Sequence, residues 1–124
     1  MRQILILLAV LALAAPAAGQ APTSLFVVIY RQGPAWKPGA PMREQPAMGA
    51  HGAYMRRLFT EGTSFAAGPT TDAPGGIVIV RASSLEAATA LMASDPAVTS
   101  GMFLGEIHAW APAFRSDQPL PAGR

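Results

Sequence analysis

The chain has 124 residues, nine of them Lys or Arg and seven Asp or Glu, which gives a formal net charge of +2. The basic residues are scattered, and the adjacent pair Arg56-Arg57 is best explained as part of the solvent-exposed face of a helix. This distribution excludes the clustered positive surface that nucleic-acid binding requires. There is no Cys, so a disulfide framework and a thiol nucleophile are excluded as well.

Residues 1–21 have the pattern of a secretory signal peptide. Arg2 provides the positive start, and an apolar run of about 12 residues follows, shorter than the roughly 20 that a spanning helix needs. An uncleaved membrane anchor is the alternative, but Pro16 and the small residues around it favour cleavage. We expect a periplasmic or secreted protein that has no contact with the membrane after cleavage.

The remaining chain is long enough for one domain with a small core. We assign residues 22–111 to this domain and residues 112–124, which are polar and rich in proline, to a disordered tail. Without Arg2, eight basic groups face seven acidic ones, a net charge of +1.

The first strand is expected at Leu25–Tyr30, a β-branched and aromatic run typical of a central strand that is covered on both faces. The segment Arg31–Gln45 is rich in Pro and Gly and predicts a long loop. Its Trp36 either plugs the edge of the core or stacks on a ligand. Arg31 is either a solvated charge or a contact for an anion.

A helix is expected over Gln45–Glu61, with His51 on its apolar face. The other residues of that face are Ala47, Met48, Tyr54, Met55 and Leu58. A buried imidazole needs hydrogen-bond partners, because an unpaired polar group costs roughly 1–3 kcal/mol. His51 is therefore either a core residue satisfied by a carbonyl or a general acid or base, since histidine ordinarily titrates near neutrality.

A hairpin is expected next. Gly62 ends the helix, and the strands Thr63–Ala67 and Ile77–Val80 are joined by the turn-rich segment Gly68–Gly76, so they should pair antiparallel. Its glycines do not have the spacing of a phosphate-binding loop. Asp72 is first a turn residue and only second a site carboxylate.

The last part of the chain predicts a second helix and a final strand. Ser83 and Glu86 form a capping box for the helix Leu85–Ala93, which is expected to bury Leu85, Ala88, Leu91 and Met92. Asp95 then caps a fresh turn that begins with Pro96, and this structural role is enough to explain both residues. The strand Met102–Trp110 places Glu106 and His108 on one face, with His108 exposed.

The order of the elements is βαββαβ. Two right-handed crossovers place both helices on one face of a four-stranded antiparallel sheet, which is an α+β fold of the ferredoxin-like type. The other sheet face would be a large apolar patch, so we expect a second copy to cover it in a homodimer.

The chain from Leu25 to about Ala111 resembles the YCII-related family. The pieces that carry the resemblance are GPAW at Gly33–Trp36, H-x-x-Y at His51–Tyr54 with Leu58 and Gly62 behind it, AGP at Ala67–Pro69, Gly75-Gly76, the helical LEAA, DPAV at Asp95–Val98 with Gly101, and HAW at His108–Trp110.

This resemblance implies a fold of the dimeric α/β-barrel type and a site built on His51 and Asp95, with the corner Gly68-Pro69 nearby. One relative is associated with dehydrochlorination of a chlorinated hydroxyquinol, and muconolactone isomerases share the broader fold, but kinship of fold does not transfer a reaction. The export signal departs from the family, much of which looks cytoplasmic.

Together these observations favour a cofactor-independent lyase or isomerase that acts on a small molecule. In this hypothesis His51 is the base and Asp95 orients it, while Arg31, Trp36 and Tyr54 shape the pocket with Gly68 and Pro69. The alternative is a non-catalytic homodimeric binding or accessory module, in which the same pair only fastens a helix to a loop. No metal is expected, because the two histidines are separated by most of the domain.

Overall fold

The computed structural model describes residues 23–118. The expected signal peptide and the last six residues of the tail lie outside this range. The elements are β1 (Ser24–Gln32), the short 3-10 helix η1 (Met42–Glu44), α1 (Met48–Thr60), β2 (Ser64–Pro69), β3 (Gly75–Ala82), α2 (Leu85–Ala93), α3 (Pro96–Thr99) and β4 (Phe103–Trp110).

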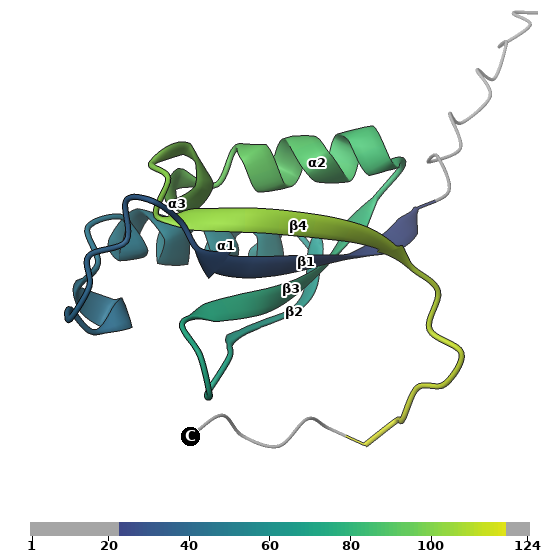
Figure 1. Cartoon of the computed structure of the whole chain (residues 1–124). Coiled ribbons are helices and arrows are strands. Elements are labelled where there is room, and N and C mark those ends of the chain that lie inside the picture. Colours follow the sequence, from purple (N-terminus) through teal and green to yellow (C-terminus); the bar gives the residue numbers. More distant parts are fainter. Residues whose placement is uncertain (1–22, 119–124) are drawn as a thin grey trace, which may run out of the picture.

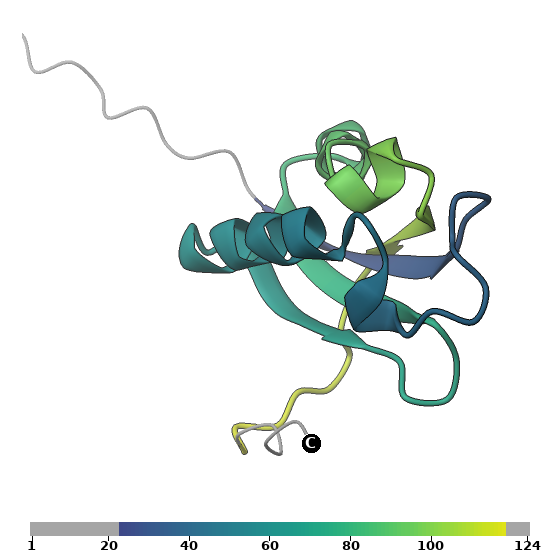
Figure 2. The ribbon, with the colours of Figure 1, turned by 90° about the vertical axis from the view of Figure 1, so that its left-hand side faces the viewer.

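The four strands form one antiparallel sheet in the order β2-β3-β1-β4. Figures 1 and 2 show the helices on one side of this sheet. The predicted ferredoxin-like α+β fold is therefore confirmed, with η1 and α3 as short additions. None of the helices within residues 23–118 has the length and apolar character needed to cross a bilayer.

The strands and α1 differ from their expected bounds. β1 and β3 are longer than predicted because each is hydrogen-bonded on both sides and continues as far as its neighbours do. α1 begins at Met48 and not at Gln45, because the Gln45 side chain is used by the preceding loop. Its amide donates to the carbonyls of Lys37 and Ala40, and its oxygen accepts from the Lys37 N–H.

The start of α2 corrects two details of the prediction. Its N-cap is Ser84, not Ser83: the Ser84 backbone is extended, and its hydroxyl accepts from the N–H of Ala87 at 3.1 Å. Leu85 is half exposed, because this first helical residue points away from the sheet, whereas Ala88 is fully buried as expected.

The core lies between the sheet and the helices. On β1 the inner residues are Phe26, Val28 and Tyr30, each at most 4% exposed. Other buried members include Val78, Val80, Ala82, Ala88, Ala97, Met102 and Phe103. This alternation along β1 decides which of its side chains can reach a site under the helices.

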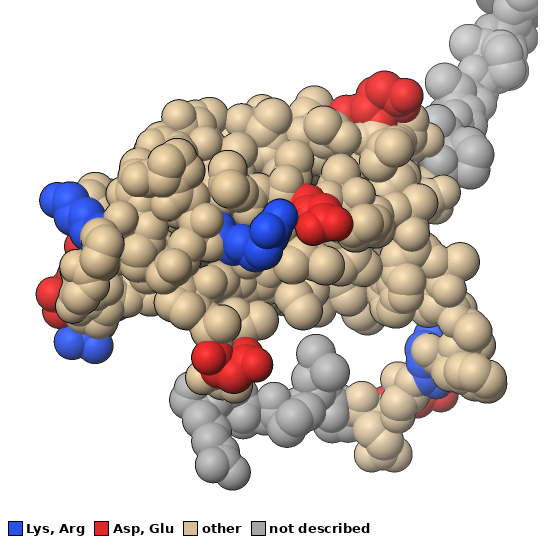
Figure 3. All heavy atoms as spheres, in the orientation of Figure 1, with Lys and Arg blue, Asp and Glu red and all other residues tan. Residues whose placement is uncertain are grey.

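The outer face of the sheet is only half covered in a single subunit. The outward residues of β1, Leu25, Val27 and Ile29, keep intermediate exposure, so the expectation that this strand is covered on both faces is wrong for one chain taken alone. Neighbouring Ile77 and Leu104 are exposed, and Figure 3 shows few charged side chains on this face. The homodimer stays a prediction.

Candidate functional site

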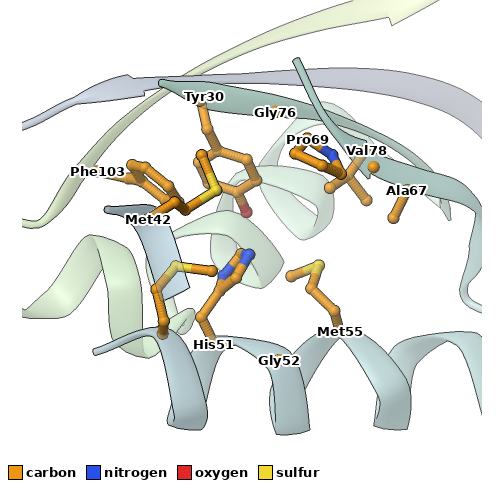
Figure 4. Close-up of a pocket in the computed structure, with 13 residues that line it drawn as sticks. Tyr30, Met42, His51, Gly52, Met55, Ala67, Pro69, Gly76, Val78 and Phe103 are labelled. Carbon is orange, nitrogen blue, oxygen red and sulfur yellow. The ribbon is translucent and has the colours of Figure 1, made fainter. Parts of the chain in front are cut away.

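A cavity of about 240 Å³ opens between α1 and the inner face of the sheet. Figure 4 shows Tyr30 and Phe103 on the sheet side and His51, Gly52 and Met55 on the side of α1. The remaining lining residues are Met42, Met48, Ala67, Gly68, Pro69, Gly75, Gly76 and Val78. The walls are therefore mostly apolar, with an imidazole and a phenol as their polar groups.

His51 lies in the second turn of α1, on the face that turns toward the sheet, as its spacing from Met48 and Met55 predicts. Its side chain is 13% exposed. The ring packs edge-on against Tyr30 and Phe103, with centroid distances of 5.7 and 5.6 Å. These two contacts fix the plane of the imidazole in the cavity wall.

Asp95 is the hydrogen-bond partner of this histidine. His51 Nδ1 lies 2.8 Å from Oδ2 of Asp95 and 3.0 Å from Oδ1, although the two residues are 44 positions apart in sequence. The carboxylate is fully buried and is also the N-cap of α3, where Oδ1 accepts from the N–H of Ala97 at 2.9 Å. Because a carboxylate only accepts, Nδ1 carries the proton and Nε2 is left for the cavity.

Tyr30 is a second polar group beside the same carboxylate. Burial, followed by the nearby negative charge of Asp95, raises the pKa of Tyr30 far above its ordinary value. The phenol therefore stays neutral. Asp95 accepts from an imidazole and a backbone amide, which satisfies an otherwise costly buried charge.

Of the other five residues that the sequence predicted for the site, two line the cavity and three do not. Gly68 and Pro69 line the cavity together with His51. Arg31 lies on the outer face of the sheet, where it is 3.6 Å from Glu106 and largely exposed.

The two predicted aromatic residues lie outside the cavity. Trp36 stacks on the far side of Phe103, with centroids 5.8 Å apart, so it supports the wall. Tyr54 points to α2, where its hydroxyl donates to the carbonyl of Leu91 at 2.7 Å.

Sequence reasoning did not name Tyr30, Phe103, Gly52 or the three methionines as site residues. Tyr30 carried a usable signal, because it continues the alternation of Phe26 and Val28 to the end of the strand. Met48 and Met55 share the helix face of His51 and could have been included on that ground. Nothing in the sequence marks Met42 or Phe103, which reach the cavity only through the fold.

The other histidine has a carboxylate partner but no cavity. His108 Nε2 lies 2.9 Å from Oε1 of Glu106 on the outer face of β4, with both side chains about half exposed. It provides a natural comparison for the buried pair. Within residues 23–118, no group of three or more His, Cys, Asp or Glu side chains is arranged to hold a metal ion.

The two tyrosines of the chain predict a loss of stability in alkali. Burial raises the pKa of Tyr30 and also that of Tyr54. A raised pKa in the folded state stabilises the fold fully below the ordinary tyrosine pKa of about 10, and this stabilisation is lost as the pH rises through the higher folded value. We expect the melting temperature to fall from about pH 10 upward, and Tyr30→Phe to reduce that fall more than Tyr54→Phe does.

Circular dichroism melting curves between neutral and strongly alkaline pH check this expectation. Tyrosine absorbance gives the second measurement, because both phenols should ionise above the ordinary tyrosine pKa. Ionisation of two phenols in the folded protein at the ordinary tyrosine pKa would contradict it.

Most of the described chain matches the model of a known domain family. The model of the YCII-related domain matches residues 24–111, which include all four strands and the His51–Asp95 pair. The chain belongs to the YCII-related family. Among curated proteins, none matches it.

Among the solved structures that resemble this YCII-related chain is 5-chloro-2-hydroxyhydroquinone dehydrochlorinase from Burkholderia phenoliruptrix, in complex with 2,5-dihydroxybenzoquinone. The TM-score is 0.53 and the sequences are 24% identical, and the alignment covers 69% of this chain and 93% of the other. At this identity the likeness supports the fold alone.

Proposed function

We propose that this protein is a cofactor-independent enzyme of lyase or isomerase type, which moves a proton on a small molecule bound between α1 and the sheet. His51 is the general base and acid, and Asp95 is its positioning residue. The observation that carries the proposal is the engagement of Nδ1 by a buried carboxylate, which leaves Nε2 of the same ring for the cavity.

The chemistry follows from the tautomer. With the Nδ1 proton donated to Asp95, Nε2 has a free lone pair and accepts a proton from a bound compound, and the resulting imidazolium is stabilised by the same carboxylate. Return of the proton to another atom of the compound completes an isomerisation, and loss of a leaving group in its place completes an elimination. The dehydrochlorinase that shares the fold is an enzyme whose name describes an elimination.

Export is part of this proposal. It is supported by the composition of residues 1–21, with Arg2 ahead of a short apolar run and small residues. The compound would then be encountered outside the cytoplasm.

Exchange of carbon-bound hydrogen for deuterium tests the proton-transfer role without knowledge of the reaction. We expect the wild type to catalyse exchange from D₂O into members of a panel of small aromatic and lactone-like compounds, followed by NMR. His51→Gln and Asp95→Asn should each lower the exchange rate by about 10²–10⁴-fold. The matched control is His108→Gln, which alters the exposed pair and should leave the rate unchanged.

The alternative, a non-catalytic binding module, is favoured by one observation: Asp95 also caps α3 and so joins that turn to α1. Under this alternative, His51→Gln and Asp95→Asn lower the melting temperature, while no compound of the panel exchanges in the wild type. Exchange that persists at the wild-type rate in His51→Gln would refute the proposed base.

A further inference from the structure

The charge around the cavity restricts what it can bind. Among the described residues that line it, there is no Lys, Arg, Asp or Glu. The Asp95 carboxylate, which contacts the lining residue His51, is negative. A bound anion would lose its hydration without gaining a cationic partner, so the cavity disfavours carboxylates and phosphates.

The imidazole of the cavity provides a hydrogen-bond acceptor. In neutral His51, Nε2 has a free lone pair, because the proton is on the Nδ1 that donates to Asp95. A compound that fits Nε2 must supply the donor itself, and a hydroxyl group does so.

The size and walls of the cavity fit one ring. An apolar cavity of about 150 Å³ holds benzene, so about 240 Å³ leaves room for a ring with small substituents. Met42, Met48 and Met55 lie around this space, as Figure 4 shows for the first and last of them. Thioether sulfur makes favourable contacts with aromatic rings, and its flexible side chain adapts to their shape.

Gly52 provides the surface against which such a ring can pack. It follows His51 on α1 and lines the cavity, and a Cβ built on it meets no atom within 4 Å. Glycine in the middle of a helix is unfavourable for the helix itself. The space that it leaves beside the imidazole is therefore the part of the cavity that a side chain would fill most directly.

We propose that the cavity binds an uncharged single-ring compound that carries a hydroxyl group, with the ring against the α1 backbone at Gly52 and the hydroxyl donating to Nε2 of His51. The inference rests on the proposed function, since it assigns the class of ligand to the same site. It adds two requirements, a hydrogen-bond donor and the absence of negative charge.

Three matched probes test these requirements by isothermal titration calorimetry at neutral pH: 4-methylphenol, its methyl ether and 4-methylbenzoate. We expect 4-methylphenol to bind, the ether to bind at least tenfold more weakly because it has no donor, and the benzoate to bind at least tenfold more weakly because it is an anion. Equal binding of the ether, tighter binding of the benzoate, or no binding of the phenol would overturn the inference.

Glycine variants test whether the ring packs against the α1 backbone at Gly52. Gly52→Ala and Gly52→Val should weaken the binding of 4-methylphenol, by at least tenfold for valine. The controls are Gly49→Ala and Gly49→Val, at an exposed position of the same helix where a Cβ also meets nothing. They should change binding by less than twofold. Both alanine variants should melt no lower than the wild type, so unfolding could not explain a loss of binding. Unchanged binding in Gly52→Val would refute the placement of the ring at Gly52.

The failure of this inference and that of the proposed function are distinguishable. If 4-methylphenol binds as expected while His51→Gln leaves deuterium exchange unchanged, the ligand class stands and the base is wrong. If exchange depends on His51 but the benzoate binds best, the base stands and the ligand class is wrong.

Discussion

Replacement of Asp95 by alanine is expected to lower the free energy of unfolding by about 3 kcal/mol, because one fully buried carboxylate carries out two structural tasks. Loss of the N-cap of α3 accounts for about 1 kcal/mol. Loss of the charge-assisted contact to His51 accounts for about 1.5–3 kcal/mol. The measurement is urea unfolding at neutral pH.

Glu106→Ala is the matched control for this variant. Glu106 also holds a histidine at 2.9 Å, but both partners are about half exposed, so its removal should cost less than about 1 kcal/mol. Asp95→Asn keeps the size and a capping oxygen and should fall between the two. Equal losses for Asp95→Ala and Glu106→Ala would mean that burial adds nothing to the His51–Asp95 pair.

Gly33→Ala is expected to cost about 3 kcal/mol through a direct backbone clash, at the upper end of overpacking. A Cβ at Gly33 would lie 2.2 Å from the carbonyl oxygen of Gly101. The two segments cannot simply separate, because the Gly33 N–H donates to the Met102 carbonyl at 2.7 Å and the Ala35 N–H donates to the Gly101 carbonyl at 3.0 Å. This close approach gives a physical reason for the first residue of the GPAW segment.

Gly49→Ala is the control for Gly33→Ala, since its Cβ would enter open space. It should be neutral or stabilising by up to about 1 kcal/mol. Chemical unfolding of both variants gives the comparison. A Gly33→Ala protein as stable as the wild type would show that the junction between β1 and the turn after α3 adapts at little cost.

The local patterns of the chain were sufficient for the order of its elements. The apolar run at Leu25–Tyr30, the helical spacing around His51 and the Asp95-Pro96 boundary each have a local physical cause, namely burial of a strand, burial of a helix face and capping of a turn. Asp95 is the N-cap that was expected. At the two neighbouring serines Ser83 and Ser84 the prediction was wrong, because the side chain that caps the helix is that of Ser84.

The sequence by itself determined that His51 faces inward and that Asp95 sits at the start of a turn, since both follow from neighbours within one helical turn. The tertiary structure decided that the two meet, because loop and sheet geometry bring together residues 44 positions apart. It also decided the side of the sheet: both faces of β1 are apolar, so alternation alone could not tell that Tyr30 points under the helices and Arg31 away from them. The cavity itself belongs to the fold, because an empty space depends on how residues from six elements pack and not on any one of them.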